Sequence, residues 1–155
     1  MCETAHVVRA SRSRPALQAL LRGEAAPPRP LGMRMMLHHR HAAPGRWSGE
    51  IVFDRSAANS QGIVFGGSLA AILDVAMGYA SLTLLADDEL QRTVEMKVSF
   101  LRPAPPDRVL ADGEVLRRGR RLAYCEGTIR VPDGTVVAKA SGTFSVGRPR
   151  GTGAP

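Results

Sequence analysis

The sequence predicts a single α+β domain in which one long apolar helix is wrapped by an antiparallel sheet. At 155 residues the chain has the length of one domain. Residues 68–85 are apolar on every side of a helix, so this helix must be covered on more than one side. The segments before and after it have the pattern of strands joined by short turns, and hairpin-linked strands pair antiparallel. We expect the sheet, and a second copy of the chain, to cover the helix.

Two strands are expected before the helix. They occupy residues 31–41 and 47–53, and a turn that contains Pro44 and Gly45 separates them. Upstream, residues 1–30 are expected to form an N-terminal extension with a short helix and a proline-rich linker.

Four strands are expected after the helix. In the first, at residues 94–100, apolar side chains occupy the even positions and polar side chains the odd ones, which predicts one buried face. The other three are expected at residues 109–116, 122–131 and 135–146. The folded domain should therefore extend over residues 31–147, and residues 148–155 are expected to be a disordered tail.

The chain is basic, with 21 Lys and Arg against 14 Asp and Glu and a net charge of +7. Such a charge favours an anionic partner, either nucleic acid or a phosphorylated small molecule. The arginines are scattered outside residues 117–121, and the aromatic content of 5% is low for a base-stacking platform. We expect a phosphate-bearing small molecule as the partner. Nucleic acid is not expected, because the net charge is the only feature that supports it.

Neither a membrane span nor a metal site is expected. The N-terminus lacks the apolar stretch of a signal peptide, and Asp74 at the centre of the helix favours a buried soluble helix. Of the clustered histidines, His39 and His41 share one face of a strand while His38 faces away, which leaves a metal ion short of ligands. We expect a cytoplasmic protein with no membrane partner.

Asp74 is the candidate catalytic residue. It is the only charged residue between Arg55 and Asp87. A carboxylate in apolar surroundings is costly to bury, so it usually has a hydrogen-bond partner or a function. Two interpretations stay open on this pattern: a structural carboxylate that binds a helix end or loop, and a general base or nucleophile.

The glycine pair Gly66-Gly67 is the candidate oxyanion site. Backbone N–H groups at a helix start have no intrahelical acceptor and can bind a polarised oxygen. Gly66 lies about 12 Å from Asp74 along a helix, whereas a base and an oxyanion donor must both reach one carbonyl group. We therefore expect the two to act together from different chains, at the interface of a two-fold dimer.

The loop at residues 59–67 carries a more specific pattern. It has the spacing Asn-x-x-Gly-x-x-Phe-Gly-Gly and is followed by Asp74 in the helix. It is neither a P-loop nor a nucleophile elbow, because neither motif's remaining residues follow. The pattern resembles the hotdog-fold acyl-CoA thioesterases of the phenylacetyl-CoA (PaaI-like) type, whose signature runs Asn, Gly, His-Gly-Gly and then a helix that carries Asp. The resemblance covers about residues 31–146 and implies the hotdog fold.

The resemblance implies a role for each matching residue. Asp74 matches the residue that activates water or attacks the thioester carbonyl. The N–H of Gly66 matches the group that polarises the carbonyl oxygen, and Asn59 matches an amide that orients water or substrate. Thr93, on the strand that faces the partner, matches a hydroxyl that helps to place the water.

Substrate contacts are expected from a second set of residues. Phe65 takes the place of the family histidine in His-Gly-Gly, and with Gly67 it is expected to contact the acyl group. Three arginines suit the phosphates of coenzyme A by charge: Arg102, Arg120 and Arg121.

The sequence therefore predicts a homodimeric or homotetrameric acyl-CoA thioesterase that releases a free acid and coenzyme A. Coenzyme A enters as part of the substrate, and no cofactor is expected. The alternative is a non-catalytic hotdog domain that binds acyl-CoA or another ligand, which Phe65 favours. A hydratase or dehydratase is not expected, because these hotdog enzymes use a histidine and none occurs after His41.

Overall fold

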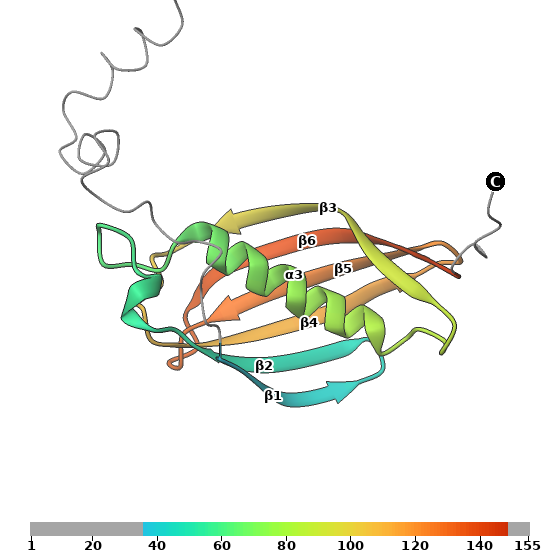
Figure 1. Cartoon of the computed structure of the whole chain (residues 1–155), viewed down its shortest axis with the longest axis horizontal. Helices are drawn as coiled ribbons and strands as arrows, with labels where there is room; N and C mark the ends of the chain where they lie inside the picture. Colours follow the sequence, from blue (N-terminus) through green and yellow to red (C-terminus); the bar gives the residue numbers. More distant parts are fainter. Residues whose placement is uncertain (1–35, 149–155) are drawn as a thin grey trace, which may run out of the picture.

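The computed structural model describes residues 36–148 and shows one long helix packed on a six-stranded antiparallel sheet (Figure 1). This arrangement confirms the predicted α+β hotdog architecture. The predicted extension at residues 1–30 and nearly all of the predicted tail lie outside the described residues. The elements are β1 Met36–Ala43, β2 Arg46–Val52, the 3-10 helix η1 Arg55–Ala57, α3 Gly66–Leu82, β3 Leu90–Phe100, β4 Arg108–Arg118, β5 Leu122–Arg130 and β6 Val136–Gly147.

The strands lie in the order β1-β2-β4-β5-β6-β3, and every neighbouring pair is antiparallel. The β1–β2 and β5–β6 hairpins turn at Gly45 and Gly134, whose positive φ values of 74° and 89° suit glycine. Since β3 follows the helix, the chain crosses the sheet and adds β3 beside β6. Strands β1 and β3 are therefore the two edges of the sheet (Figure 1).

Helix α3 lies across one face of the sheet, and its inward side forms the core with Leu73, Ala76 and Met77 fully buried. The close approach depends on Gly113 of β4, where a Cβ atom would lie 2.1 Å from the Ala76 carbonyl oxygen. The sheet covers only one side of the helix. Within residues 36–148 no helix is long and apolar enough to cross a membrane.

The structure corrects both ends of the predicted helix. It begins at Gly66, so the glycine pair forms the first turn and does not precede it. It ends at Leu82, three residues early, because the Thr83 hydroxyl donates to the Ala80 carbonyl and accepts from the Gly45 N–H, at 2.6 and 2.7 Å. These bonds fix the helix end against the β1–β2 hairpin.

Strand β3 breaks the predicted alternation. Its register with β6 shifts between Thr93 and Glu95, which leaves Val94 as the extra residue of a β-bulge. Val94 was predicted to be buried but is 58% exposed, whereas Met96 and Val98 pack against the core as predicted. The bulge reverses the alternation and turns the Thr93 side chain toward α3.

Candidate active site

Asp74 and Thr93 meet where α3 passes the edge strand. The Asp74 side chain is partly buried, and its Oδ1 accepts a hydrogen bond of 2.9 Å from the Thr93 hydroxyl. Its Oδ2 has no hydrogen-bond partner among residues 36–148. One carboxylate oxygen is therefore held in place, and the other is available to a ligand.

This pair forms one wall of a cleft of about 310 Å³. The ring of Tyr79 in the cleft stacks on the buried Trp47, with ring centroids 5.3 Å apart. Together with Val75 and Leu82, Tyr79 gives the cleft an apolar surface near the carboxylate. The residues that line the cleft are Asp74, Val75, Gly78, Tyr79, Leu82, Gln91, Arg92, Thr93 and Phe144.

The first turn of α3 presents unpaired backbone donors. Its N-cap residue Phe65 makes no side-chain cap, and the N–H groups of Gly66 and Gly67 donate to no residue in the described part of the chain. These groups lie at the positive end of the helix dipole. They can therefore bind a negatively charged oxygen.

Gly66 lines a second cleft of about 300 Å³, beside the other end of β3. Phe100 was predicted to be buried but is 54% exposed here, and its ring packs on Gly66, where a Cβ atom would lie 3.3 Å from Cζ. The residues that line this cleft are Asn59, Ile63, Val64, Gly66, Leu69, Phe100, Leu101, Arg102, Pro103 and Ala104.

Asn59 closes the loop that leads to the helix. Its Oδ1 accepts hydrogen bonds from the backbone N–H groups of Gln61, at 2.8 Å, and Ile63, at 3.4 Å. Gly62 in the same turn has a positive φ of 75°. The side-chain oxygen of Asn59 thus serves the loop, while its NH₂ group donates to no described residue. Only that NH₂ group is left for water or substrate.

Phe65 lies over Gly67 at the helix start. A Cβ atom on Gly67 would be 2.5 Å from the Phe65 Cε1, so the ring occupies the space that a side chain there would need. The Phe65 side chain is 39% exposed. It therefore leaves an apolar surface beside the two free N–H groups.

Within one chain, the base and the oxyanion donors face different clefts. The cleft of Asp74 and the cleft of Gly66 share no lining residue. This separation agrees with the spacing of about 12 Å expected along a helix. One protomer thus does not bring both groups to a single carbonyl.

The three candidate arginines do not form one cluster. Arg102 lines the Gly66 cleft and donates to the Val136 carbonyl, at 3.2 Å. Arg120 and Arg121 are exposed in the β4–β5 turn, where the Arg121 carbonyl accepts from the Val146 N–H. Because residues 136 and 146 are at opposite ends of β6, roughly 30 Å apart, these arginines cannot bind one phosphate group within a protomer.

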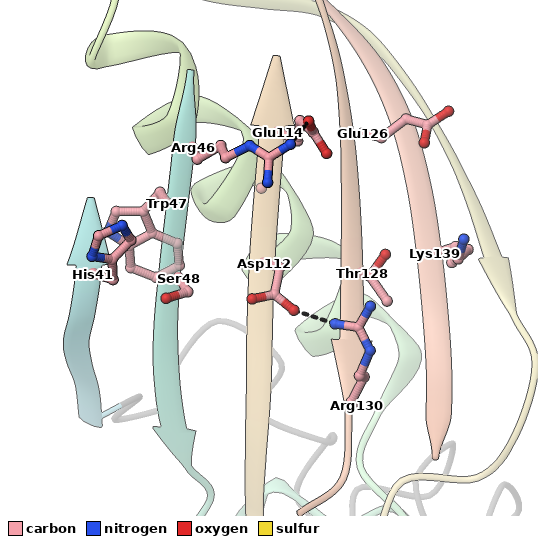
Figure 2. Close-up of a pocket in the computed structure, with 11 residues that line it drawn as sticks. His41, Arg46, Trp47, Ser48, Asp112, Glu114, Glu126, Thr128, Arg130 and Lys139 are labelled. Carbon is pink, nitrogen blue, oxygen red and sulfur yellow. Dashed lines mark hydrogen bonds and ion pairs between the residues drawn. The ribbon is translucent and has the colours of Figure 1, made fainter. Parts of the chain in front are cut away.

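A wider cavity of about 420 Å³ lies on the face of the sheet away from α3 (Figure 2). Its charged side chains largely neutralise one another, since Arg130 pairs with Asp112 and Arg46 pairs with Glu114. None of the residues predicted to act on a substrate lines it. We therefore place the candidate site on the α3 side of the sheet.

Neither a cysteine nucleophile nor a metal site offers an alternative to Asp74 within the described residues. Burial in the core raises the pKa of the Cys125 thiol to about 11, which disfavours the nucleophilic thiolate. Residues 36–148 contain no cluster of three side chains able to hold a metal ion.

Comparison with known proteins assigns the class. The sequence profile of the thioesterase superfamily matches residues 61–138. The chain belongs to the thioesterase superfamily, which confirms the resemblance seen in the loop at residues 59–67.

Individual relatives extend this likeness. YigI of Salmonella typhimurium, a medium/long-chain acyl-CoA thioesterase, is 32% identical over 101 residues, which are 57% of this chain and 65% of YigI. A phenylacetic acid degradation-related protein of Ralstonia eutropha has a structure with a TM-score of 0.69 and 30% identity, covering 84% of this chain and 98% of that one. A thioesterase family protein of Silicibacter pomeroyi reaches a TM-score of 0.67 at 29% identity, covering 94% and 99%.

Proposed function

We propose that the chain is an acyl-CoA thioesterase in which Asp74 acts as the general base. The observation that carries the proposal is the Asp74–Thr93 hydrogen bond at a cleft of mixed polar and apolar lining, with Oδ2 of the carboxylate left open. Membership of the thioesterase superfamily and the acyl-CoA thioesterase activity in the name of YigI support the same reaction.

In the proposed reaction, Asp74 removes a proton from water as the water oxygen attacks the thioester carbonyl. The Thr93 hydroxyl keeps the carboxylate oriented, and its oxygen can also accept a hydrogen bond from that water. The tetrahedral oxyanion is stabilised by the Gly66 N–H group and the helix start. Its collapse breaks the C–S bond, and the proton on Asp74 passes to the leaving sulfur to give coenzyme A and the free acid.

The proposed site is shared between two protomers. Within residues 36–148, strand β3 pairs with β6 alone, so its other side carries backbone groups that no described strand pairs. Large apolar side chains are exposed along it, with Leu90 at 51%, Val94 at 58% and Phe100 at 54%. A second copy that pairs along this edge would bury them. It could bring its Gly66 toward Asp74 of the first chain.

The remaining predicted contacts have narrower proposed roles. Phe65 and Gly67 offer an apolar surface for the acyl or pantetheine group. Of the three candidate arginines, Arg102 is the one that lines the same cleft as the proposed oxyanion donor Gly66. Arg120 and Arg121 would reach coenzyme A phosphates only from the far end of the sheet.

A panel of aryl, short-chain and medium-chain acyl-CoAs, with the released thiol measured, tests the proposal. The wild-type chain should hydrolyse at least one class. The variant Asp74→Asn keeps the size of the side chain but cannot act as a base, so its kcat should fall about a hundredfold or more. Full activity of Asp74→Asn on the best substrate would exclude Asp74 as the base.

Phe65 supports a second candidate function, a non-catalytic domain that binds acyl-CoA. The ring lies directly over the helix start that would hold the oxyanion. Saturable binding of acyl-CoAs by calorimetry, without hydrolysis of any of them, would favour this function over catalysis.

A further inference from the structure

Gln91 joins the edge strand to the helix beside the Asp74–Thr93 pair. Its Nε2 donates a hydrogen bond of 2.7 Å to the carbonyl oxygen of Gly78, and its side chain lines the Asp74 cleft. The amide can present only its NH₂ group to this carbonyl, because the amide oxygen would be repelled. The orientation of the side chain is therefore set by Gly78.

Two hydrogen bonds connect α3 to β3 at matching intervals: Gln91 to the Gly78 carbonyl, and Thr93 to Asp74. From Asp74 to Gly78 the helix rises about 6 Å, and from Gln91 to Thr93 the strand advances roughly 6.6 Å. Since the strand runs opposite to the helix, Thr93 meets Asp74 when Gln91 meets Gly78. The hydrogen bond from Gln91 to Gly78 thus fixes where β3 lies along the helix axis.

The strand becomes irregular next to this contact. On one side β3 is paired with β6, but the register of that pairing shifts immediately after Thr93, at the bulge. A bulge loosens the ladder locally. Residues 90–93 are paired with residues 144–147 of β6, and Thr93 is the last of these pairs before the bulge. The Gln91 bond to Gly78 ties this last regular stretch to α3, next to the Thr93 hydroxyl.

Stability of the fold does not account for a glutamine here. Its Oε1 is buried and has no hydrogen-bond partner in the described part of the chain, which costs free energy. Gly78 lies inside the helix, where its carbonyl is already placed to accept from the N–H four residues later. An unbranched apolar side chain would fill the same space without an unsatisfied oxygen.

We infer that Gln91 is a positioning residue for the reaction: it acts through Thr93 by holding β3 so that the Thr93 hydroxyl stays on Asp74. The inference rests on the proposed function. It assigns no contact between Gln91 and the reacting atoms.

The test compares steady-state kinetics of Gln91→Met, Thr93→Val and the double variant. The kcat of Gln91→Met should fall about tenfold, with KM within about twofold and a melting temperature no lower than that of the wild type. Because Gln91 acts only through Thr93, the double variant should be no slower than Thr93→Val alone. Lys97→Met, on the opposite face of the same strand, is the control and should keep the wild-type rate.

The possible outcomes separate this inference from the function it rests on. If the wild type hydrolyses no thioester, both are overturned. If the wild type is active and Asp74→Asn is not, while Gln91→Met keeps the wild-type kcat, only the role of Gln91 is overturned. A Gln91→Met loss that multiplies with the Thr93→Val loss, or that follows a lowered melting temperature, also contradicts it.

Discussion

The Thr93 hydroxyl reaches Oδ1 of Asp74, at 2.9 Å, because a bulge reverses the alternation of β3. In a regular strand, Thr93 would share a face with Glu95 and point away from the helix. The extra residue at Val94 instead turns Thr93 toward α3. The arrangement of the candidate site therefore depends on a local irregularity of the edge strand.

Removing the Thr93 hydroxyl should slow hydrolysis without changing the fold. Thr93→Val keeps the shape of the side chain but loses the donor, and a hydrogen bond to a charged group contributes roughly 1.5–3 kcal/mol. We expect kcat to fall about tenfold or more. Thr93→Ser retains the hydroxyl and serves as the control, so equal rates for the two variants would contradict this role.

Gly66→Pro should remove the oxyanion donor at little structural cost. Proline is well accepted in the first position of a helix, and the extended backbone of Phe65, at φ −61° and ψ 132°, suits a residue before proline. The kcat of Gly66→Pro should drop about a hundredfold. Gly66→Ala places a similar atom against the Phe100 ring but keeps the N–H group. The two variants should differ strongly in kcat, and equal losses would point to packing instead.

Gly113→Ala should destabilise the domain. The new Cβ atom would lie 2.1 Å from the Ala76 carbonyl oxygen, so α3 would have to move away from β4. We expect a loss of about 2–3 kcal/mol in the free energy of unfolding, measured with urea. Gly147→Ala meets nothing within 4 Å and is the control. A Gly113→Ala variant as stable as this control would show that the helix packs less closely.

A charge on the edge strand should prevent pairing of two protomers. Val94→Lys places an ammonium group on the exposed edge of β3, a substitution that disfavours edge-to-edge pairing. We expect a lower mass by light scattering after size exclusion, together with loss of activity. Leu116→Lys changes a residue of similar exposure, 51%, on β4 and should leave the assembly intact. An unchanged mass for Val94→Lys would exclude the β3 edge as the interface.

Much of the fold could be predicted because burial repeats along the chain. The apolar run gave α3, and the alternation in β3 placed Met96 and Val98 inward correctly. The bulge could not be predicted, because it arises from the register with β6, which is distant in sequence. The start of α3 was misplaced because Phe65 carries no capping group and two glycines follow it.

The candidate site was predictable in part. Asp74 was found from its isolation in an apolar run, and Gly66 from the motif before the helix. Gln91 gave no signal, since its role depends on a helix carbonyl that only the packing brings near. Arg102 and Arg121 were both predicted from their charge to contact coenzyme A phosphates, but the structure places them at opposite ends of β6.

Mixing two inactive chains tests whether the site is built from two protomers. In co-expressed Asp74→Asn and Gly66→Pro chains, half of the dimers should be mixed, and each mixed dimer should hold one intact site. A site shared between protomers predicts a recovery of about one quarter of the wild-type activity, from two chains that are each inactive alone. If Asp74 and Gly66 of the same chain act together, no mixed dimer holds an intact site. A mixture as inactive as its components would therefore contradict a shared site.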